Sequence, residues 1–263
     1  MPSHINTSNP INALIAIYNF GYYKSGDKDI AQALLANLQR VPDCTIETLA
    51  ELCNVSVSTF QRFYKDIGYK TYSEFKIKIT ESLSTHIDKN IHANTDRQPG
   101  EDSVDALFRQ ARESIGLVSA SLDHARMLAL ASDMHRYDQI YIHDTYFSSA
   151  KLFLQGDLAL DGKKTVLSLY TEQQQHDLAE LDENCFLLAF CGRSARYREI
   201  ENEIPAARRK GTRIGVLCMA PVFRHADACD HLIICKGTGS SLDMMAADLL
   251  FTALSTTYRE NCL

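Results

Sequence analysis

The spacing of apolar side chains divides the chain into an all-helical first part and a second part in which short apolar runs alternate with helices. Up to about residue 92, apolar positions recur every three or four residues, the period of an amphipathic helix. Two more helical stretches follow, at 103–119 and 121–135. Five predicted strands come next: QIYIH (139–143), KTVLSL (164–169), CFLLAF (185–190), RIGVLC (213–218) and HLIIC (231–235).

Short apolar strands that alternate with helices predict a parallel sheet covered on both faces. We therefore expect the fold class α + α/β, with an all-helical domain followed by a doubly wound, five-stranded parallel sheet. The polar segment ANTDRQPGE contains Pro99 and Gly100 and suits a linker. The expected division is a first domain at 1–92, a linker at 93–102 and a second domain at 103–263, whose last helix runs from about Ser240 to Glu260.

Residues 45–79 predict two short helices joined by a tight turn, followed by a third helix from Ser73. Thr45 and Ser56 are suitable N-caps for the first two helices, and Gly68 can end the second in the left-handed conformation. In a helix-turn-helix, such a second helix presents polar groups to base edges while nearby cations hold phosphates. A helical hairpin with a solvated polar face is the alternative. The outward side chains of the second helix are Ser58, Thr59, Gln61, Arg62 and Lys65.

The stretch TIETLAELCNVSVSTFQRFYKDIGYKTYSEFK lies within a segment, 22–79, that resembles the N-terminal domain of RpiR-type bacterial transcription regulators. The resemblance covers the pattern xIxxLAxxxxVSxSTxxRFxxxxGYxxYSEFK. It implies a helix-turn-helix that binds operator DNA. The DNA-binding residues expected on this basis are Ser56, Ser58, Thr59, Gln61, Arg62, Lys65, Lys70 and Tyr72.

The same family joins this domain to a sugar isomerase (SIS) domain, a five-stranded parallel sheet that binds phosphosugars. The resemblance implies effector-binding loops after the first strand (HDTYFSS), after the third strand (AFCGRS) and before the last helix. Both strand loops depart from the SIS pattern. His143 and Thr145 replace two glycines, and Ala189 and Cys191 replace two hydroxyl residues. The effector-binding residues expected are His143, Tyr146, Ser148, Cys191, Gly192, Arg193, Ser194, Ser240 and Ser241.

The resemblance as a whole implies a transcription regulator whose operator affinity is controlled by a phosphosugar or a related phosphorylated metabolite. Two alternatives stay open. The SIS domain could serve only for dimerisation or sense a ligand that is not a phosphosugar, or the chain could be an isomerase with His143, His176 or Glu199 as the base. We expect no enzymatic activity, because a fused DNA-binding domain and a reduced hydroxyl cluster disfavour turnover. The expected partners are double-stranded DNA, the metabolite and further copies of the chain in a homodimer or tetramer.

Composition and cysteine content predict where in the cell the protein is found. The chain is 45% hydrophobic and 23% charged, as in soluble globular proteins. Its eight cysteines form no CxxC pair, which favours free thiols in a reducing compartment. No apolar run approaches the roughly 20 residues that span a bilayer. The start MPSHINTSNP does not have the pattern of a secretory signal. We therefore expect a cytoplasmic protein without membrane association.

The net charge of −6 is distributed unevenly. The first 90 residues carry as many basic as acidic side chains, so the whole excess of negative charge lies in the second part. A neutral first part with a basic segment can contact a polyanion. Four residues could bind a metal ion by their type: His225, Cys229, His231 and Cys235. Their spacing does not match that of common structural zinc sites, so we expect no metal. We also expect no cofactor.

Overall fold

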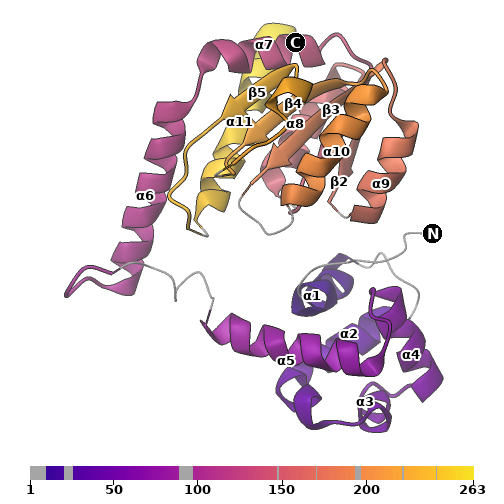
Figure 1. Ribbon diagram of the computed structural model, residues 1–263. Helices are drawn as coiled ribbons and strands as arrows, with labels where there is room; N and C mark the ends of the chain where they lie inside the picture. Colours follow the sequence, from indigo (N-terminus) through magenta and orange to yellow (C-terminus); the bar gives the residue numbers. More distant parts are fainter. Residues whose placement is uncertain are drawn as a thin grey trace. The chain divides into compact units, whose positions relative to one another are not determined.

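The computed structural model describes residues 10–20, 26–88, 97–146, 148–169, 171–192, 197–220, 222–240 and 242–263 (Figure 1); the side chains of residues 20, 84–88, 171 and 172 are not described. The chain divides into two compact units, Met1–Ala93 and Asn94–Leu263. Among the helices of these described ranges, none is long and apolar enough to cross a membrane.

The first unit is entirely helical in its described residues. Its elements are α1 (Pro10–Phe20), α2 (Asp27–Ala36), the 3-10 helix η1 (Leu38–Asp43), α3 (Ile46–Leu52), α4 (Val57–Asp66) and α5 (Tyr72–Asp88).

Local capping chemistry sets the geometry of α3 and α4. The side chain of Thr45 accepts a hydrogen bond from the Thr48 amide (3.3 Å), and that of Ser56 accepts one from the Thr59 amide (3.1 Å). Between the two helices Asn54 adopts a positive φ of 52°, which asparagine tolerates better than most residues. Gly68 ends α4 with a φ of 100°, so the predicted caps and the left-handed glycine are confirmed.

A cluster of aromatic rings forms the core of the first unit. Phe60 and Phe63 of α4 are buried, and the Phe60 ring meets Phe75 of α5 edge-to-face at a centroid distance of 6.1 Å. Tyr64 stacks on the same Phe75 ring at 6.2 Å. Because these rings bury one side of α4 against α5, the opposite side of α4 is left to the solvent.

The second unit is a doubly wound sheet. Its strands are β1 (Gln139–His143), β2 (Lys164–Ser168), β3 (Cys185–Cys191), β4 (Arg213–Cys218) and β5 (His231–Ile234), and all of the pairings are parallel, in the order β2-β1-β3-β4-β5. The other elements are α6 (Ser103–Ser121), α7 (His124–Met134), α8 (Ser149–Leu160), α9 (Thr171–Glu180), α10 (Tyr197–Arg209), the 3-10 helix η2 (Ala226–Ala228) and α11 (Asp243–Cys262).

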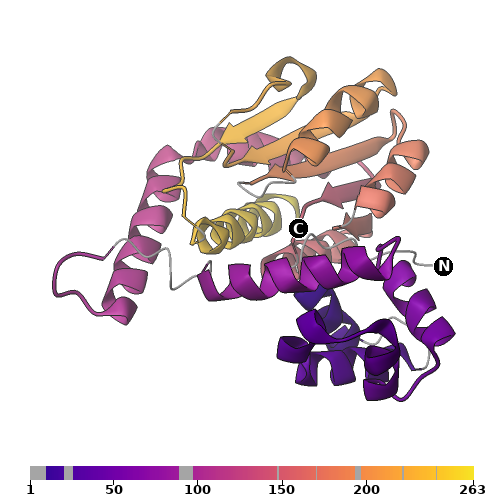
Figure 2. The ribbon, with the colours of Figure 1, turned by 60° about the horizontal axis from the view of Figure 1, so that its bottom comes forward.

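Helices cover both faces of this sheet (Figures 1 and 2). On one face, Ile140 and Leu188 of the strands share a buried cluster with Leu130 of α7, Leu158 of α8 and Phe251 of α11. Alternate strand residues form a second cluster with α10 and the end of α9 on the other face. Figure 2 shows α11, in yellow, and α10, in orange, on opposite sides of the strands. The predicted fold class is confirmed.

Some helix boundaries differ from the predicted ones. The helix expected from Ser73 begins at Tyr72, and the helix expected from residue 121 begins at His124. In the second case the Asp123 side chain accepts a hydrogen bond from the Arg126 amide (3.0 Å) and acts as the N-cap. The last helix begins at Asp243 instead of Ser240.

We expect Phe60→Ala to lower the free energy of unfolding of the first unit by about 3–5 kcal/mol, the usual cost of removing a buried phenylalanine side chain. Phe60 is fully buried and contacts three other rings. Chemical denaturation followed by circular dichroism measures the change. Ile77→Ala is the matched control, because Ile77 is 55% exposed on α5 and its loss should stay within about 0.5 kcal/mol. Equal effects of the two substitutions would contradict the packing described here.

Candidate functional site

The solvent-facing side of α4 carries the residues that the sequence places at DNA. Arg62 and Lys65 are exposed, and within the described residues their side chains take part in no hydrogen bond or ion pair. The period of the α-helix places positions 61, 62 and 65 on the side of α4 that faces away from the buried rings of Phe60 and Phe63. The exposed members of the predicted set are Ser56, Ser58, Gln61, Arg62, Lys65 and Lys70, while Thr59 and Tyr72 are half-buried.

Three hydroxyl groups form a small network at the start of α4. The Ser56 hydroxyl lies 2.9 Å from the Ser58 hydroxyl and 2.9 Å from that of Thr59. Ser56 also caps the helix through the Thr59 amide. These short side chains are therefore held in fixed orientations at the exposed N-terminus of the helix, where backbone amides favour anions.

Tyr72 has a different place from the other predicted residues. Its hydroxyl donates a hydrogen bond to the Cys44 carbonyl (2.7 Å), and Lys76 donates to the same oxygen (3.0 Å). Burial raises the pKa of Tyr72 to about 12, so the phenol stays a donor at neutral pH. The Lys70 backbone amide donates to Glu74 (2.8 Å), and Lys70 is exposed. Tyr72 thus braces α5 against the residue before the N-cap of α3.

The second unit has one position where ligands of doubly wound folds usually bind. Along the sheet order, the direction of winding reverses between β1 and β3. At such a switch point the loops that follow the two strands separate and leave a crevice at the carboxyl edge. Here this edge carries His143, the last residue of β1, with Asp144 after it, and Cys191, the last residue of β3, with Gly192 after it.

His143 is fully buried at this edge and is bound on both sides by carboxylates. Its Nε2 lies 3.1 Å from Asp177 of α9, and its Nδ1 lies 3.1 Å from Glu203 of α10. Ser168, at the end of β2, donates a hydrogen bond to the same Asp177 oxygen (2.5 Å). Burial acts to lower the pKa of His143, but the hydrogen bonds to the two carboxylates outweigh it and raise the pKa. Because each ring nitrogen faces a carboxylate oxygen, both nitrogens are positioned to donate.

Asp144 and Lys151 form a second buried pair next to His143. The Lys151 ammonium lies 2.8 Å from Asp144 Oδ2, and neither side chain has exposed surface. Asp144 Oδ1 accepts hydrogen bonds from the amides of Thr145 (2.5 Å) and Tyr146 (3.3 Å). Burial raises the pKa of Asp144 to about 6 and lowers the pKa of Lys151. The Tyr146 ring covers the ammonium at 3.4 Å from the ring centroid, and Ser148 accepts a hydrogen bond from it (3.2 Å).

The remaining effector residues predicted from the sequence are used internally or lie outside the described residues. Cys191 is buried, which raises the pKa of its thiol. Gly192 adjoins the Phe190 ring, which would lie 2.7 Å from a Cβ at this position. Ser240 is bonded to Thr238 (2.9 Å) and accepts from the Leu242 amide (3.2 Å). The predicted residues outside the described ranges are Arg193, Ser194 and Ser241.

The hydroxyl groups in the loop before α11 do not cap that helix. Its N-cap is Leu242, which has no side-chain cap bond, so neither Thr238 nor Ser240 acts as the cap. Instead the Asp243 carboxylate accepts from the amides of Thr238 (2.9 Å) and Gly239 (2.8 Å). It also accepts from the Ser114 hydroxyl (2.6 Å) of α6. The loop amides are thus satisfied by a carboxylate of the chain itself.

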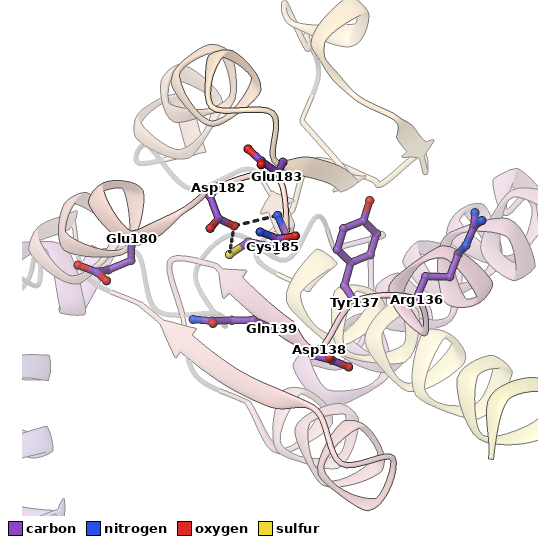
Figure 3. A pocket seen from close by; sticks show the side chains of 9 residues that line it. Arg136, Tyr137, Asp138, Gln139, Glu180, Asp182, Glu183 and Cys185 are labelled. Carbon is purple, nitrogen blue, oxygen red and sulfur yellow. Dashed lines mark hydrogen bonds between the residues drawn. The ribbon is translucent and has the colours of Figure 1, made fainter.

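A hollow of about 370 Å³ lies at the opposite edge of the sheet, where β1 and β3 begin (Figure 3). Asp182 on its wall accepts hydrogen bonds from the Cys185 thiol (3.2 Å) and the Asn184 amide (2.8 Å), which lower the pKa of Asp182. None of the predicted effector residues lines it, and its acidic wall would repel a phosphorylated ligand. Its charged residues are Arg136, Asp138, Glu180, Asp182 and Glu183.

Sequence reasoning missed most of the groups that fill the switch point. Asp144 directly follows a predicted apolar strand, which is the signal that could have identified it. The other four lie in helices: Lys151 in α8, Gln174 and Asp177 in α9, and Glu203 in α10. A polar residue in a helix is expected to face the solvent, so the sequence did not mark them. All five residues are buried.

Comparisons with known proteins identify the first unit more specifically than the second. A curated relative from Haemophilus influenzae, described as an uncharacterized HTH-type transcriptional regulator, is 29% identical over 100 residues. The match covers 37% of this chain and 34% of that protein, so it spans about a third of the relative's length.

Two solved structures resemble larger parts of the chain at low identity. The Vibrio vulnificus NanR protein complexed with ManNAc-6P is 18% identical, with a TM-score of 0.48 over 96% of this chain and 92% of that chain. The sugar isomerase domain of an RpiR transcription factor from Sphaerobacter thermophilus is 19% identical, with a TM-score of 0.46 over 58% of this chain and 94% of that one.

The family comparison matches residues 20–86 to the helix-turn-helix domain of the rpiR family. The matched range contains α3, α4 and the Ser56 cap described above, so sequence and geometry agree on this part of the chain. Residues 20–86 are therefore a helix-turn-helix domain of the rpiR family.

Proposed function

We propose that the protein is a DNA-binding transcriptional regulator in which residues 1–92 bind an operator and residues 103–263 sense a small metabolite and dimerise, with 93–102 as the linker. The observation that carries this proposal is the exposed side of α4 in a helix-turn-helix of the rpiR family. Two long cations on that side, Arg62 and Lys65, have no internal partner in the described residues.

We infer different roles for these two cations from their positions along α4. Arg62 follows the capped N-terminus by less than two turns, where a recognition helix contacts base edges, and its guanidinium can bind a guanine through two hydrogen bonds. Lys65 lies in the last turn and Lys70 lies beyond it, so both suit contacts with phosphates on either side of the groove. A dimer would present two such helices to a two-fold operator.

We place the metabolite at the switch point of the second unit. A sugar phosphate is the ligand that the sequence resemblance suggests, and the loops after β1 and β3 are where it would bind. A ligand without phosphate is the second candidate. The buried carboxylates of Asp144, Asp177 and Glu203 favour it, because negative charge at this edge repels a phosphate. Control of operator affinity would follow from a difference in ligand affinity between two arrangements of the domains.

Catalysis is not part of this proposal. A general base needs a nitrogen or oxygen that can accept a proton from the substrate. Both ring nitrogens of His143 are bound to carboxylates, so this histidine has no free acceptor. The other two candidates, His176 and Glu199, lie on the exposed sides of α9 and α10.

We expect Arg62→Ala to weaken binding to a selected operator by roughly 1–3 kcal/mol, the loss that follows removal of a base-contacting arginine. The operator is first selected from random duplexes, and dissociation constants are then measured by fluorescence anisotropy at fixed salt. Unchanged operator affinity would remove Arg62 from the interface. Arg62→Lys is the matched variant, because it keeps the charge but loses the two-pronged hydrogen bond.

Lys65→Ala should act differently, because a phosphate contact carries no sequence information. We expect similar weakening on operator and random DNA, together with a decrease of about 1 in the slope of log affinity against log salt. The measurement is a titration at several salt concentrations. A selective loss on the operator alone would mean that Lys65 reads bases.

A metabolite that controls the protein should raise its melting temperature and change its operator affinity by a measurable factor. By linkage, operator DNA must change the affinity for that metabolite by the same factor. We would screen sugars with and without phosphate by thermal shift and then measure both factors for each stabilising compound. A panel without a stabilising compound would argue that the second unit serves only for dimerisation.

A further inference from the structure

The helices on the two faces of the sheet present different side chains to water. On α10 every exposed residue is polar, and most are charged, as on an ordinary solvated helix. On α8, all of whose residues are described, the charged side chains Lys151 and Asp157 are buried. Its exposed residues carry no charge: they are Ser149, Leu152, Phe153, Gly156, Ala159 and Leu160.

The outward side of α11 continues this uncharged surface. The two helices lie side by side and run in the same direction. Tyr146, just before α8, donates to Asp248 near the start of α11 (2.9 Å), whereas Asp157 near the end of α8 accepts from Ser255 (2.5 Å). The exposed residues of α11 before Arg259 are Met244, Met245, Leu249, Thr252 and Thr256. We call the exposed residues of these two helices up to that arginine the α8–α11 face.

The apolar part of the α8–α11 face is large. Six of its side chains are each between 47% and 73% exposed, namely Leu152, Phe153, Leu160, Met244, Met245 and Leu249. Together they expose on the order of 600 Å², which is at the upper end of the apolar patches on monomeric proteins. It is also most of the about 800 Å² that each partner buries in an interface of standard size.

Charge indicates which partner this face can take. The second part of the chain carries the whole net charge of −6. Two acidic units repel one another where their charged surfaces approach, so two copies associate most favourably through a surface without charge. Nucleic acid or a strongly charged protein would find neither a cation nor a carboxylate on the α8–α11 face to pair with. The face therefore suits a second copy of the same unit.

The shape of α8 is also self-complementary. A Cβ at Gly156 would meet nothing within 4 Å, so packing within the chain does not require glycine there. Glycine inside a helix is destabilising relative to alanine, but it leaves a notch in the helix surface. Phe153, 63% exposed, lies about one turn earlier on the same outward side. If two copies of α8 cross antiparallel about a two-fold axis between these positions, each Phe153 ring lies over the glycine of the other copy.

We propose that the α8–α11 face joins the second unit to a second copy of itself about a two-fold axis, with Phe153 of one copy seated over Gly156 of the other. The inference rests on the proposed function, which calls for a dimer, and it names the surface on which that dimer forms. A two-fold contact uses the same surface on both copies, so the assembly closes at two.

The test is the oligomeric state of the full chain, followed by sedimentation velocity over a range of protein concentrations. Wild type should be a dimer. Phe153→Asp should raise the dimer dissociation constant at least about 100-fold, because an unpaired carboxylate is costly at the centre of an interface. Val222→Asp is the matched control, because Val222 is 59% exposed in the loop between β4 and η2, outside the face. Its dissociation constant should stay within about 3-fold of wild type.

Gly156→Gln separates the interface from the fold. Glutamine is a better helix former than glycine, and the space around this position is open within the chain. At a concentration at which both proteins are monomeric, the melting temperature of the variant should therefore equal or exceed that of wild type. The dimer dissociation constant should still rise at least about 10-fold, because the new side chain fills the notch that receives the Phe153 ring.

Three results would overturn the proposal. Wild type that stays monomeric up to about 100 μM would leave the face to a different partner. Folded Phe153→Asp that dimerises like wild type would place the contact on another surface. Gly156→Gln that dimerises like wild type would do the same, and it decides the matter if Phe153→Asp does not fold. Operator binding by wild type is measured separately, so a dimer that forms through this face without binding an operator would refute the regulator proposal alone.

Discussion

The need to pair every buried charge governs the second unit. A charged side chain removed from water is costly unless an opposite charge and hydrogen bonds replace its hydration. His143 and Lys151 are both fully buried at the carboxyl edge of the sheet. Their partners come from different elements: Asp177 from α9, Glu203 from α10 and Asp144 from the loop after β1. The positions of these helices against β1 are therefore tied to one another through charge as well as through apolar packing.

This constraint also explains why the loop after β1 departs from a glycine-rich pattern. Glycine lets a backbone approach an external ligand closely. In this chain the loop after β1 instead surrounds a side chain of its own, so Thr145 and Tyr146 can carry side chains where close approach is not needed. Tyr146 uses its bulk to cover the Lys151 ammonium and shields that charge from water.

The sequence predicted local features well because their causes are local. Thr45, Ser56 and Gly68 act within one helical turn of their partners, and the alternation of short apolar runs with helices follows from burial on both faces of the sheet. The buried network could not be predicted in this way. Asp177 and Glu203 lie 34 and 60 residues from His143, and nothing near them in the chain marks them as its partners. A carboxylate in a helix has the same local pattern whether it faces water or an imidazolium.

The two bonds to the Cys44 carbonyl have a mechanical consequence. Tyr72 and Lys76 both belong to α5, the helix through which the chain leaves the helix-turn-helix. Their common acceptor directly precedes Thr45, the N-cap of α3. These two bonds tie α5 directly to the start of α3, so a displacement of α5 reaches α3 through side-chain contacts as well as along the chain between them.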